Sequence, residues 1–381
     1  MMMTVLFFTT FIGAVSVPFD TVVRIVVNKL FGIGDISDIR PATVAIVWQL
    51  YAPRGMLGLI VGAGLALVGV VMQAMVQNPL ADPYILGISS GASLGATFAI
   101  LMGSTVLAGT FLSGAGVEIF AFVGAITASV AVFALSSVGG RITSTKLVLS
   151  GCIISAICGA FSSLIVYVAP NATAMRSLTF WSLGSLSTMG FNTVIICGAV
   201  LVIAIVFFTT QLRNLNAMML GDSTATTLGV NLATLRKIYI VVTSILIAVL
   251  VSNCGIIGFV GLIIPHISRA VVGTNHWKLT PISVLLGAIF MMLADVFARS
   301  FTTSEIPIGI ITSICGAPVF AYIMIKKSYG FGGGDSRWTS RSQTSTSPFP
   351  RRGSWSMRPC TWTRGSSSAS SGPTGPGSPR F

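Results

Sequence analysis

Long apolar runs separated by short polar connections dominate the first 327 residues of the chain. A helix needs about twenty consecutive apolar residues to cross about 30 Å of hydrocarbon. Ten segments approach that length, at 3–18, 55–76, 84–103, 117–138, 146–169, 191–209, 237–254, 255–272, 279–299 and 307–325. The pattern predicts an all-α fold, a polytopic membrane helical bundle with about ten transmembrane helices.

The two ends of the chain depart from this pattern. The segment 3–18 is short and lacks both a basic flank and a small-residue cleavage site, so we interpret it as a clipped first span and not as a signal peptide. Residues 328–381 are rich in Ser, Pro, Gly and Arg, and such a tail cannot bury enough apolar surface to fold. It is either a natural disordered extension or an out-of-frame read of a GC-rich gene, and we favour the second interpretation.

Composition and charge support a membrane protein. The chain is 53% hydrophobic and only 8% charged, whereas a soluble domain carries about 25% charged residues. Its formal net charge of +13 resembles a nucleic-acid signal, but seven of the 22 basic residues follow Ser328. The others lie in short connections, as expected for a protein that faces anionic lipid. We therefore expect a lipid membrane as partner and no nucleic acid.

Residues that could carry catalysis or hold a metal are scattered. His266 and His276 are ten residues apart without a nearby Cys or carboxylate, and five of the six cysteines lie inside apolar segments without ligand spacing. No nucleophile, base and orienting group occur together, and the phosphate-binding pattern GxxxxGK[ST] is absent. The sequence thus predicts no metal, no cofactor, no catalytic residue and no ATPase site of its own.

Basic residues in short loops predict the orientation of the spans. If ten spans alternate, one side of the membrane, the cytoplasmic one, receives Arg141, Lys146, Arg213, Arg236, Lys237, Arg269, Lys278, Lys326 and Lys327. The outer side then receives Arg24, Lys29, Arg40, Arg54, Arg176 and Arg299. This sizeable outer group needs another explanation, and docking of an acidic partner is one.

The stretch QNPLADPYILGISSGASLG, from Gln77 to Gly95, interrupts the apolar pattern. Residues before proline are disfavoured in the helical region, so the pairs Asn78-Pro79 and Asp82-Pro83 predict that one span ends and the next begins here. Glycines then recur at intervals of four, at Gly87, Gly91 and Gly95. On one helix face they would let another helix backbone approach closely.

A polar loop, GDSTATTLGVNLATL, begins at Gly221. Asp222 can cap a short helix that runs to Leu228, Gly229 suits its left-handed end, and Asn231 can cap a second helix. The residues alone allow two interpretations, a protruding knob of two small helices or a simple connector.

Two further apolar segments contain glycine, proline or charged residues. GIIGFVGLIIPHISR, which starts at Gly255, is a glycine-interrupted span that is tolerated only where it packs on protein or lines a cavity. Asp295 and Arg299 are four residues apart on one helix face. They could pair locally, or Arg299 could reach outward.

Taken together, QNPLADPYILGISSGASLG, GDSTATTLGV, GIIGFVGLIIPHISRAVVG, LADVFAR and EIPIGIITSICGAPVFAYI resemble the membrane permeases of binding-protein-dependent ABC importers for ferric siderophores, haem and vitamin B12, the FecCD-type family. The resemblance runs from about residue 12 to 327. It implies a transmembrane permease domain over residues 1–327 and ten spans per subunit. It also implies a homodimer around a central pathway, two cytoplasmic ABC ATPase subunits and an extracytoplasmic substrate-binding protein.

The resemblance also implies roles for particular residues. The loop containing Gly221, Asp222, Ala225, Leu228 and Gly229 would be the coupling element that sits in a cleft of the ATPase. Arg54 in YAPR and Arg299 in LADVFAR would receive glutamates from the binding protein at the outer surface. The family usually has an arginine where this chain has Tyr51, which departs from the docking pattern.

The function that the resemblance implies is translocation in the inner membrane, most commonly of ferric siderophores, powered by a separate ATPase subunit. A haem or cobalamin importer permease is the alternative. An ion-coupled secondary transporter is a hypothesis from another class, but such proteins place carboxylates within the membrane. Carboxylates are scarce in the predicted spans, Asp295 being the clearest.

Truncation after Lys327 tests the interpretation of the tail. We expect membrane insertion and transport to be unchanged, because nothing beyond this residue can form a packed element. The measurement compares the amount in the membrane fraction and the uptake activity of residues 1–327 with those of the full chain. A truncated protein that fails to reach the membrane would show that the tail is needed.

Overall fold

The computed structural model describes residues 17–106, 116–140, 142–169, 171–186, 190–300 and 305–326. The chain divides into two units, Met1–Ser328 and Tyr329–Phe381, and every described residue belongs to the first. Within the described ranges all regular elements are helices, so the all-α prediction is confirmed. Nearly all of the predicted first span, and the whole tail 328–381, lie outside these ranges.

Among the described residues, six helices are long and apolar enough to cross a membrane. They are the continuous helix Pro41–Val76, α6 (Val117–Ser137), α7 (Ser144–Val168), α9 (Phe191–Thr210), α12 (Leu232–Cys254) and α14 (His276–Ser300). Three more are apolar but shorter, in α5 (Ile88–Val106), α13 (Val260–Val272) and α15 (Ile308–Lys326). These helices account for nine of the ten predicted segments, and the count of ten spans stays a prediction.

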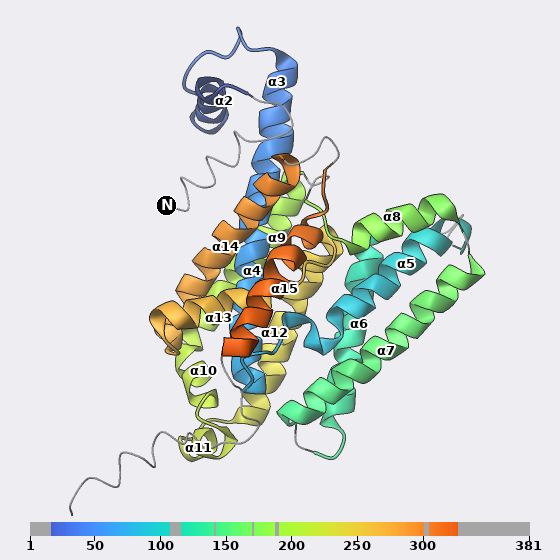
Figure 1. The fold of residues 1–381 in the computed structure, drawn as a ribbon, viewed down its shortest axis with the longest axis vertical. Helices are drawn as coiled ribbons and strands as arrows, with labels where there is room; N and C mark the ends of the chain where they lie inside the picture. Colours follow the sequence, from blue (N-terminus) through green and yellow to red (C-terminus); the bar gives the residue numbers. More distant parts are fainter. Residues whose placement is uncertain are drawn as a thin grey trace, which may run out of the picture. The chain divides into compact units, whose positions relative to one another are not determined.

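The helix Pro41–Val76 is built from α3 (Pro41–Ala45), a π-helical segment η1 (Ile46–Tyr51) and α4 (Ala52–Val76). Helices α9, α12, α13 and α14 pack around α4 (Figure 1). Nearly all of the residues of α4 are buried. Gly62 lies against Gly287 of α14 and Gly69 against Gly261 of α13, so closely that an added Cβ would overlap the facing backbone. Glycine at these contacts therefore lets the neighbouring helices pack closely enough for α4 to lie among them.

Helices α5, α6 and α7 form a second group, which α6 joins to α12 (Figure 1). As predicted, Gly91 and Gly95 lie at a tight helix interface, where a Cβ would overlap the α6 backbone at Gly124 and Phe120. The prediction that Gly87 shares this face is wrong. Gly87 lies before α5 in a left-handed conformation, φ +69°, and ends the 3-10 helix η2 (Pro83–Leu86).

The predicted break between two spans is confirmed. Helix α4 ends at Val76. A turn then begins at Asn78, just before Pro79, and the side-chain oxygen of Asn78 accepts a hydrogen bond from the Leu80 amide at 2.9 Å. Asp82 then accepts a bond from the Tyr84 amide at 2.7 Å, with Pro83 at the first position of η2. These side-chain bonds replace the helical bonds that the prolines interrupt.

The segment predicted as a span at 255–272 is helical only from Val260 onward. Gly255 ends α12 with φ +72°, and Phe259 adopts a left-handed φ of +68° before α13 begins. The Tyr84 hydroxyl donates to the carbonyl of Ile257 at 2.9 Å. The irregular backbone is thus held by protein, one of the two settings in which it is tolerated at membrane depth.

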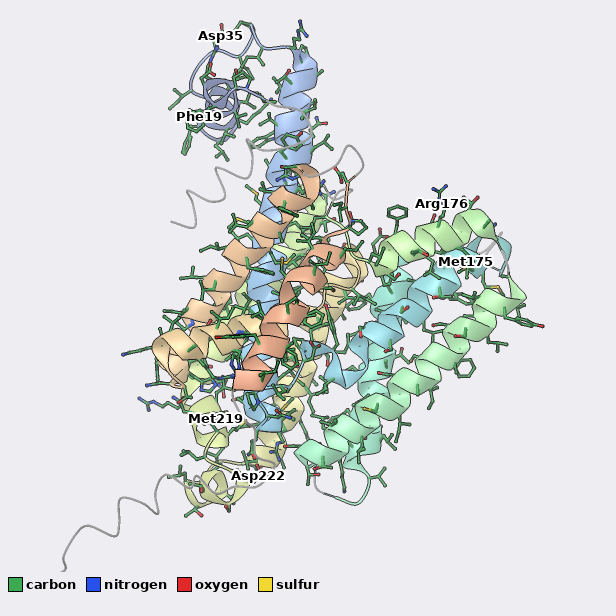
Figure 2. The ribbon with its side chains drawn as sticks, viewed as in Figure 1. Phe19, Asp35, Met175, Arg176, Met219 and Asp222 are labelled. Atoms are coloured by element: carbon green, nitrogen blue, oxygen red, sulfur yellow. The ribbon has the colours of Figure 1, made fainter. Side chains whose placement is uncertain are left out.

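Short helices lie at the two ends of the bundle. Helix α2 (Phe19–Phe31) lies beside α3, whereas α10 (Leu212–Met218) and α11 (Asp222–Thr227) lie at the other end (Figure 1). Figure 2 shows Phe19 and Asp35 at the α2 end and Asp222 at the α11 end. A further helix, α8 (Ala172–Ser182), begins with Asn171, whose side chain caps it.

Candidate functional site

At the α3 end of α4, four charged side chains form what we call the Arg54 cluster: Arg54, Asp295, Arg299 and Glu305. Arg54 Nε donates to Asp295 Oδ1 at 2.7 Å, and its Nη1 donates to both carboxylate oxygens of Glu305 at 2.9 Å. Arg299 Nη2 lies 3.1 Å from Asp295 Oδ2. Asp295 therefore lies between two guanidinium groups.

The Arg54 cluster is buried and balanced in charge. The side chains of Arg54, Asp295 and Arg299 are 7%, 1% and 1% exposed, whereas that of Glu305 is 46% exposed. Buried charges are stable only when they are paired and hydrogen-bonded. Two cations and two carboxylates meet that requirement, and Glu305 forms the part of the cluster that reaches solvent.

This geometry corrects the expectation that Arg54 and Arg299 lie exposed at an outer surface. Both are buried, and both are paired with carboxylates of the same chain. The local pair of Asp295 and Arg299 was one of the two alternatives open from the sequence. The bond between Arg54 and Asp295 joins residues 241 positions apart, and no local pattern marks it or the part played by Glu305.

Tyr51, which departs from the family pattern, also belongs to this region. The guanidinium carbon of Arg299 lies 5.1 Å from the centre of the Tyr51 ring, within the range of a cation–π interaction. Tyr51 is itself buried, 7% exposed. A tyrosine here supports Arg299 with an aromatic face and adds no third cation to a cluster that is already balanced.

Charge removal tests whether Asp295 holds the Arg54 cluster together. Asp295→Asn leaves two buried guanidinium groups without their shared carboxylate, and we expect it to cost about 3 kcal/mol of stability. Glu305→Gln is the control, because its partly exposed carboxylate should contribute less than about 1 kcal/mol. Thermal unfolding of the purified variants in detergent measures both effects. Equal losses in the two variants would contradict a central role for Asp295.

At the other end of α4 lies the loop predicted as the coupling element, 221–229. Asp222 was predicted to cap its helix, but it is the first residue of α11. Gly221 precedes it with φ +97°. The carboxylate of Asp222 instead faces Arg236 of α12, which donates to its two oxygens at 2.8 and 3.0 Å. A bidentate pair with a guanidinium is stronger than a cap on one short helix.

The rest of the loop has the local geometry that the sequence predicts. Gly229 is left-handed, φ +80°, and the amide of Val230 donates to the carbonyl of Ala225 at 3.0 Å, which closes the end of α11. Ala225 is buried, whereas Leu228 is 61% exposed. Asn231 does cap a helix, but that helix is the long α12 and not a second small one.

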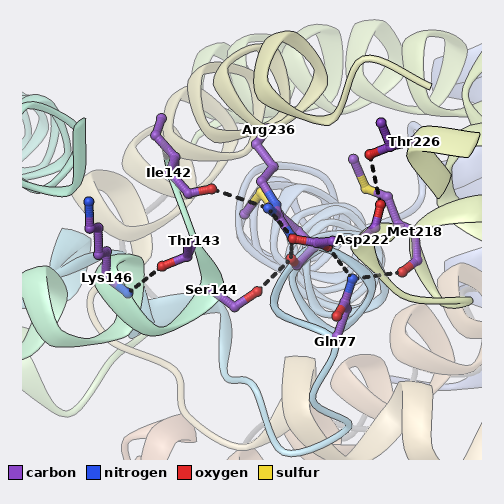
Figure 3. Close-up of polar contacts among 10 residues, drawn as sticks. Gln77, Ile142, Thr143, Ser144, Lys146, Met218, Asp222, Thr226 and Arg236 are labelled. Atoms are coloured by element: carbon purple, nitrogen blue, oxygen red, sulfur yellow. Dashed lines mark hydrogen bonds and ion pairs between the residues drawn. The ribbon is translucent and has the colours of Figure 1, made fainter. Parts of the chain in front are cut away.

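Three further contacts complete what we call the Arg236 cluster, which consists of Gln77, Asp222 and Arg236 with the backbone around them (Figure 3). Arg236 donates to the carbonyls of Ile142 at 3.2 Å and Met75 at 3.5 Å. Gln77 donates to Asp222 at 2.6 Å. The loop 221–229 is therefore joined to the end of α4 and to the segment before α7.

Within the described ranges, no three His, Cys, Asp or Glu side chains gather in a way that could hold a metal ion. His276 is buried, and its Nδ1 lies 2.8 Å from the side-chain oxygen of Asn216. This histidine therefore has a hydrogen-bonding role in the core. The chemistry of the two arginine clusters is that of ion pairs and hydrogen bonds.

Comparison with known proteins shows what kind of protein carries these features. The model of the FecCD transport family matches residues 1–326. The chain belongs to this family. It is an ABC importer permease of the FecCD type, and the loop 221–229 and the two arginine clusters are parts of such a permease.

Two relatives and one solved structure show how close the similarity is. A probable iron chelatin transport system permease from Helicobacter pylori is 39% identical over 74% of this chain and 82% of its own length. The cobalamin import system permease BtuC of Halobacterium salinarum is 38% identical over 73% of each chain. An inward-facing structure titled as a metal-chelate type ABC transporter has a TM-score of 0.68 and 34% identity, covering 81% of this chain and 98% of that one.

Proposed function

We propose that this FecCD permease works in the inner membrane as a homodimer and imports a ferric siderophore. The observation that carries the proposal is the family match over residues 1–326, together with the similarity to a relative named for iron chelatin and to a metal-chelate type transporter. Haem or cobalamin is the alternative cargo, and the similarity to a cobalamin permease supports this alternative.

Energy would come from two separate ATPase subunits that bind the 221–229 loop. The sequence has no phosphate-binding loop of its own. Leu228, which follows α11, presents an exposed apolar side chain, and Ala225 anchors α11 in the core. Burial of an exposed apolar side chain against a partner is favourable. We therefore propose that α11 and Leu228 form the ATPase contact.

An extracytoplasmic binding protein would deliver the ligand at the Arg54 cluster. Arg54 and Arg299 are buried, so a carboxylate of the binding protein cannot simply add to them. It can instead replace Glu305, which is 46% exposed and bonded to Arg54. Such an exchange keeps the charge of the cluster balanced, as burial requires.

Uptake by reconstituted vesicles tests the cargo and the energy source. The permease, its ATPase and its binding protein are placed in liposomes, and entry of radioactive ferric hydroxamate chelate is measured with and without ATP. We expect entry only with ATP and with all three proteins, and weak competition by haem or cobalamin. ATP-independent entry driven by an ion gradient would favour a secondary transporter, and stronger competition by cobalamin or haem would reassign the cargo.

Affinity for the binding protein tests the exchange at Glu305. Glu305→Gln removes the internal competitor and should tighten association at low salt, whereas Arg54→Gln should weaken it about tenfold, or about 1.4 kcal/mol. The effect of Glu305→Gln should fade as salt rises, because Glu305 is partly exposed and exposed charges are screened. Glu118→Gln, at an exposed carboxylate outside the cluster, is the control. Unchanged affinity in both cluster variants would rule out this docking site.

A further inference from the structure

A single guanidinium, that of Arg236, contacts three separate segments of the chain (Figure 3). It donates to the carboxylate of Asp222 at 2.8 and 3.0 Å, to the carbonyl of Ile142 at 3.2 Å and to the carbonyl of Met75 at 3.5 Å. Asp222 begins α11, Ile142 precedes α7, and Met75 is in the last turn of α4. One side chain therefore holds these three segments together.

Burial makes this connection stiff. The Arg236 side chain is 4% exposed, whereas that of Asp222 is 48% exposed. A buried guanidinium that loses its carboxylate is left with an uncompensated charge, which is strongly unfavourable. If a partner displaces Asp222, Arg236 must therefore follow it. The pair transmits a displacement of the loop better than an exposed ion pair would.

The end of α4 and the start of α7 share one acceptor in this arrangement. The last carbonyls of a helix have no partner within the helix, and the carbonyl of Met75 receives Arg236. Ser144, the first residue of α7, also directs its hydroxyl to the Met75 carbonyl, at 3.4 Å. Movement of the guanidinium therefore acts on both helices at once.

Gln77 provides a second connection between the loop and α4. Its backbone is left-handed, φ +56°, at the end of α4. Its side-chain amide donates to Asp222 Oδ1 at 2.6 Å and to the carbonyl of Met218, the last residue of α10, at 3.0 Å. Asp222 is thus bonded from α4 directly as well as through Arg236, and the start of the loop cannot move independently of α4.

We propose that Arg236 is the positioning residue that couples the 221–229 loop to the cytoplasmic ends of α4 and α7. The inference rests on the proposed function, in which an ATPase displaces this loop. It adds the route by which that displacement reaches the helices. Asp222 is the residue that receives the displacement, and Gln77 keeps Asp222 in register with α4.

A reporter on α7 makes the inference testable without knowledge of the cargo. Thr145, exposed at the second position of α7, is changed to Cys. The background carries Ser at the exposed Cys152 and Cys315 and at Cys360 of the tail. The rate of labelling by a water-soluble maleimide is measured in the complex with the ATPase, without nucleotide and with ATP plus vanadate. Copurification of the ATPase is measured in parallel.

Four variants separate positioning from a merely structural role. In the otherwise unchanged chain, nucleotide should change the labelling rate about fivefold or more, the lower range of coupling between two sites. Asp222→Asn and Arg236→Gln should abolish this change while the ATPase still copurifies, and Arg236→Lys, which keeps the charge, should restore part of it. Thr234→Ala, at an exposed position of α12 outside both the 221–229 loop and the Arg236 cluster, should behave like the unchanged chain.

Three outcomes would contradict either the inference or the proposed function. A full nucleotide effect in both Asp222→Asn and Arg236→Gln, with the ATPase bound, overturns the inference. So does the absence of any nucleotide effect in the unchanged chain when the ATPase is bound, because α7 then does not respond. If the ATPase does not copurify with the unchanged chain, the proposed function itself fails. If Arg236→Gln does not fold, Gln77→Asn provides a second test, because Asn tolerates the left-handed backbone but is too short to reach Asp222.

Discussion

A helix that is surrounded by other helices over most of its length must satisfy the polar groups at its ends from within the protein. Helix α4 is in this position because glycines at its contacts with α13 and α14 let the backbones approach each other closely. At its start α4 continues the helix from η1, and its first turn carries the Arg54 side chain, which pairs with Asp295 and Glu305. At its other end the carbonyl of Met75 accepts a bond from Arg236 of α12. The Arg54 cluster thus pairs a buried side-chain charge, and the Arg236 cluster satisfies a carbonyl at the end of the helix.

The carboxylates of the two clusters differ from one another in how exposed they are. Asp295 is 1% exposed and is enclosed between two arginines, so it is suited to holding the ends of α4 and α14 together. Asp222 and Glu305 are 48% and 46% exposed. Each is bonded to a buried arginine and yet reaches solvent. A partner at either end of the helix would therefore meet a carboxylate before it met a guanidinium.

Local rules of sequence predicted much of this structure. The break after α4, the tight contact at Gly91 and Gly95 and the left-handed Gly229 all follow from proline, glycine and capping chemistry within a few residues. The errors arose where a distant contact decided the outcome. Asp222 could have capped α11, but Arg236 offers a stronger bidentate bond.

The polar contacts between residues far apart in the sequence were the least predictable features. Arg54 and Asp295 are 241 residues apart, and Arg236 and Met75 are 161 apart. The basic residues predicted for the outer side called for an explanation other than contact with lipid. The sequence could not show that, for Arg54 and Arg299, the acidic partners belong to the same chain.

The spacing of the two clusters along α4 relates this protein to the thickness of its bilayer. Arg54 and Gln77 are roughly 35 Å apart along a straight helix, at 1.5 Å per residue, which is close to the 30 Å of a hydrocarbon core. We therefore expect the partly exposed carboxylates of the two clusters, Glu305 and Asp222, to lie near the two faces of the hydrocarbon. Residues from Pro41 to Tyr51 would then extend beyond it. A much thicker membrane would draw one of these carboxylates towards lipid, so hydrophobic matching would favour membranes of ordinary thickness for this helix.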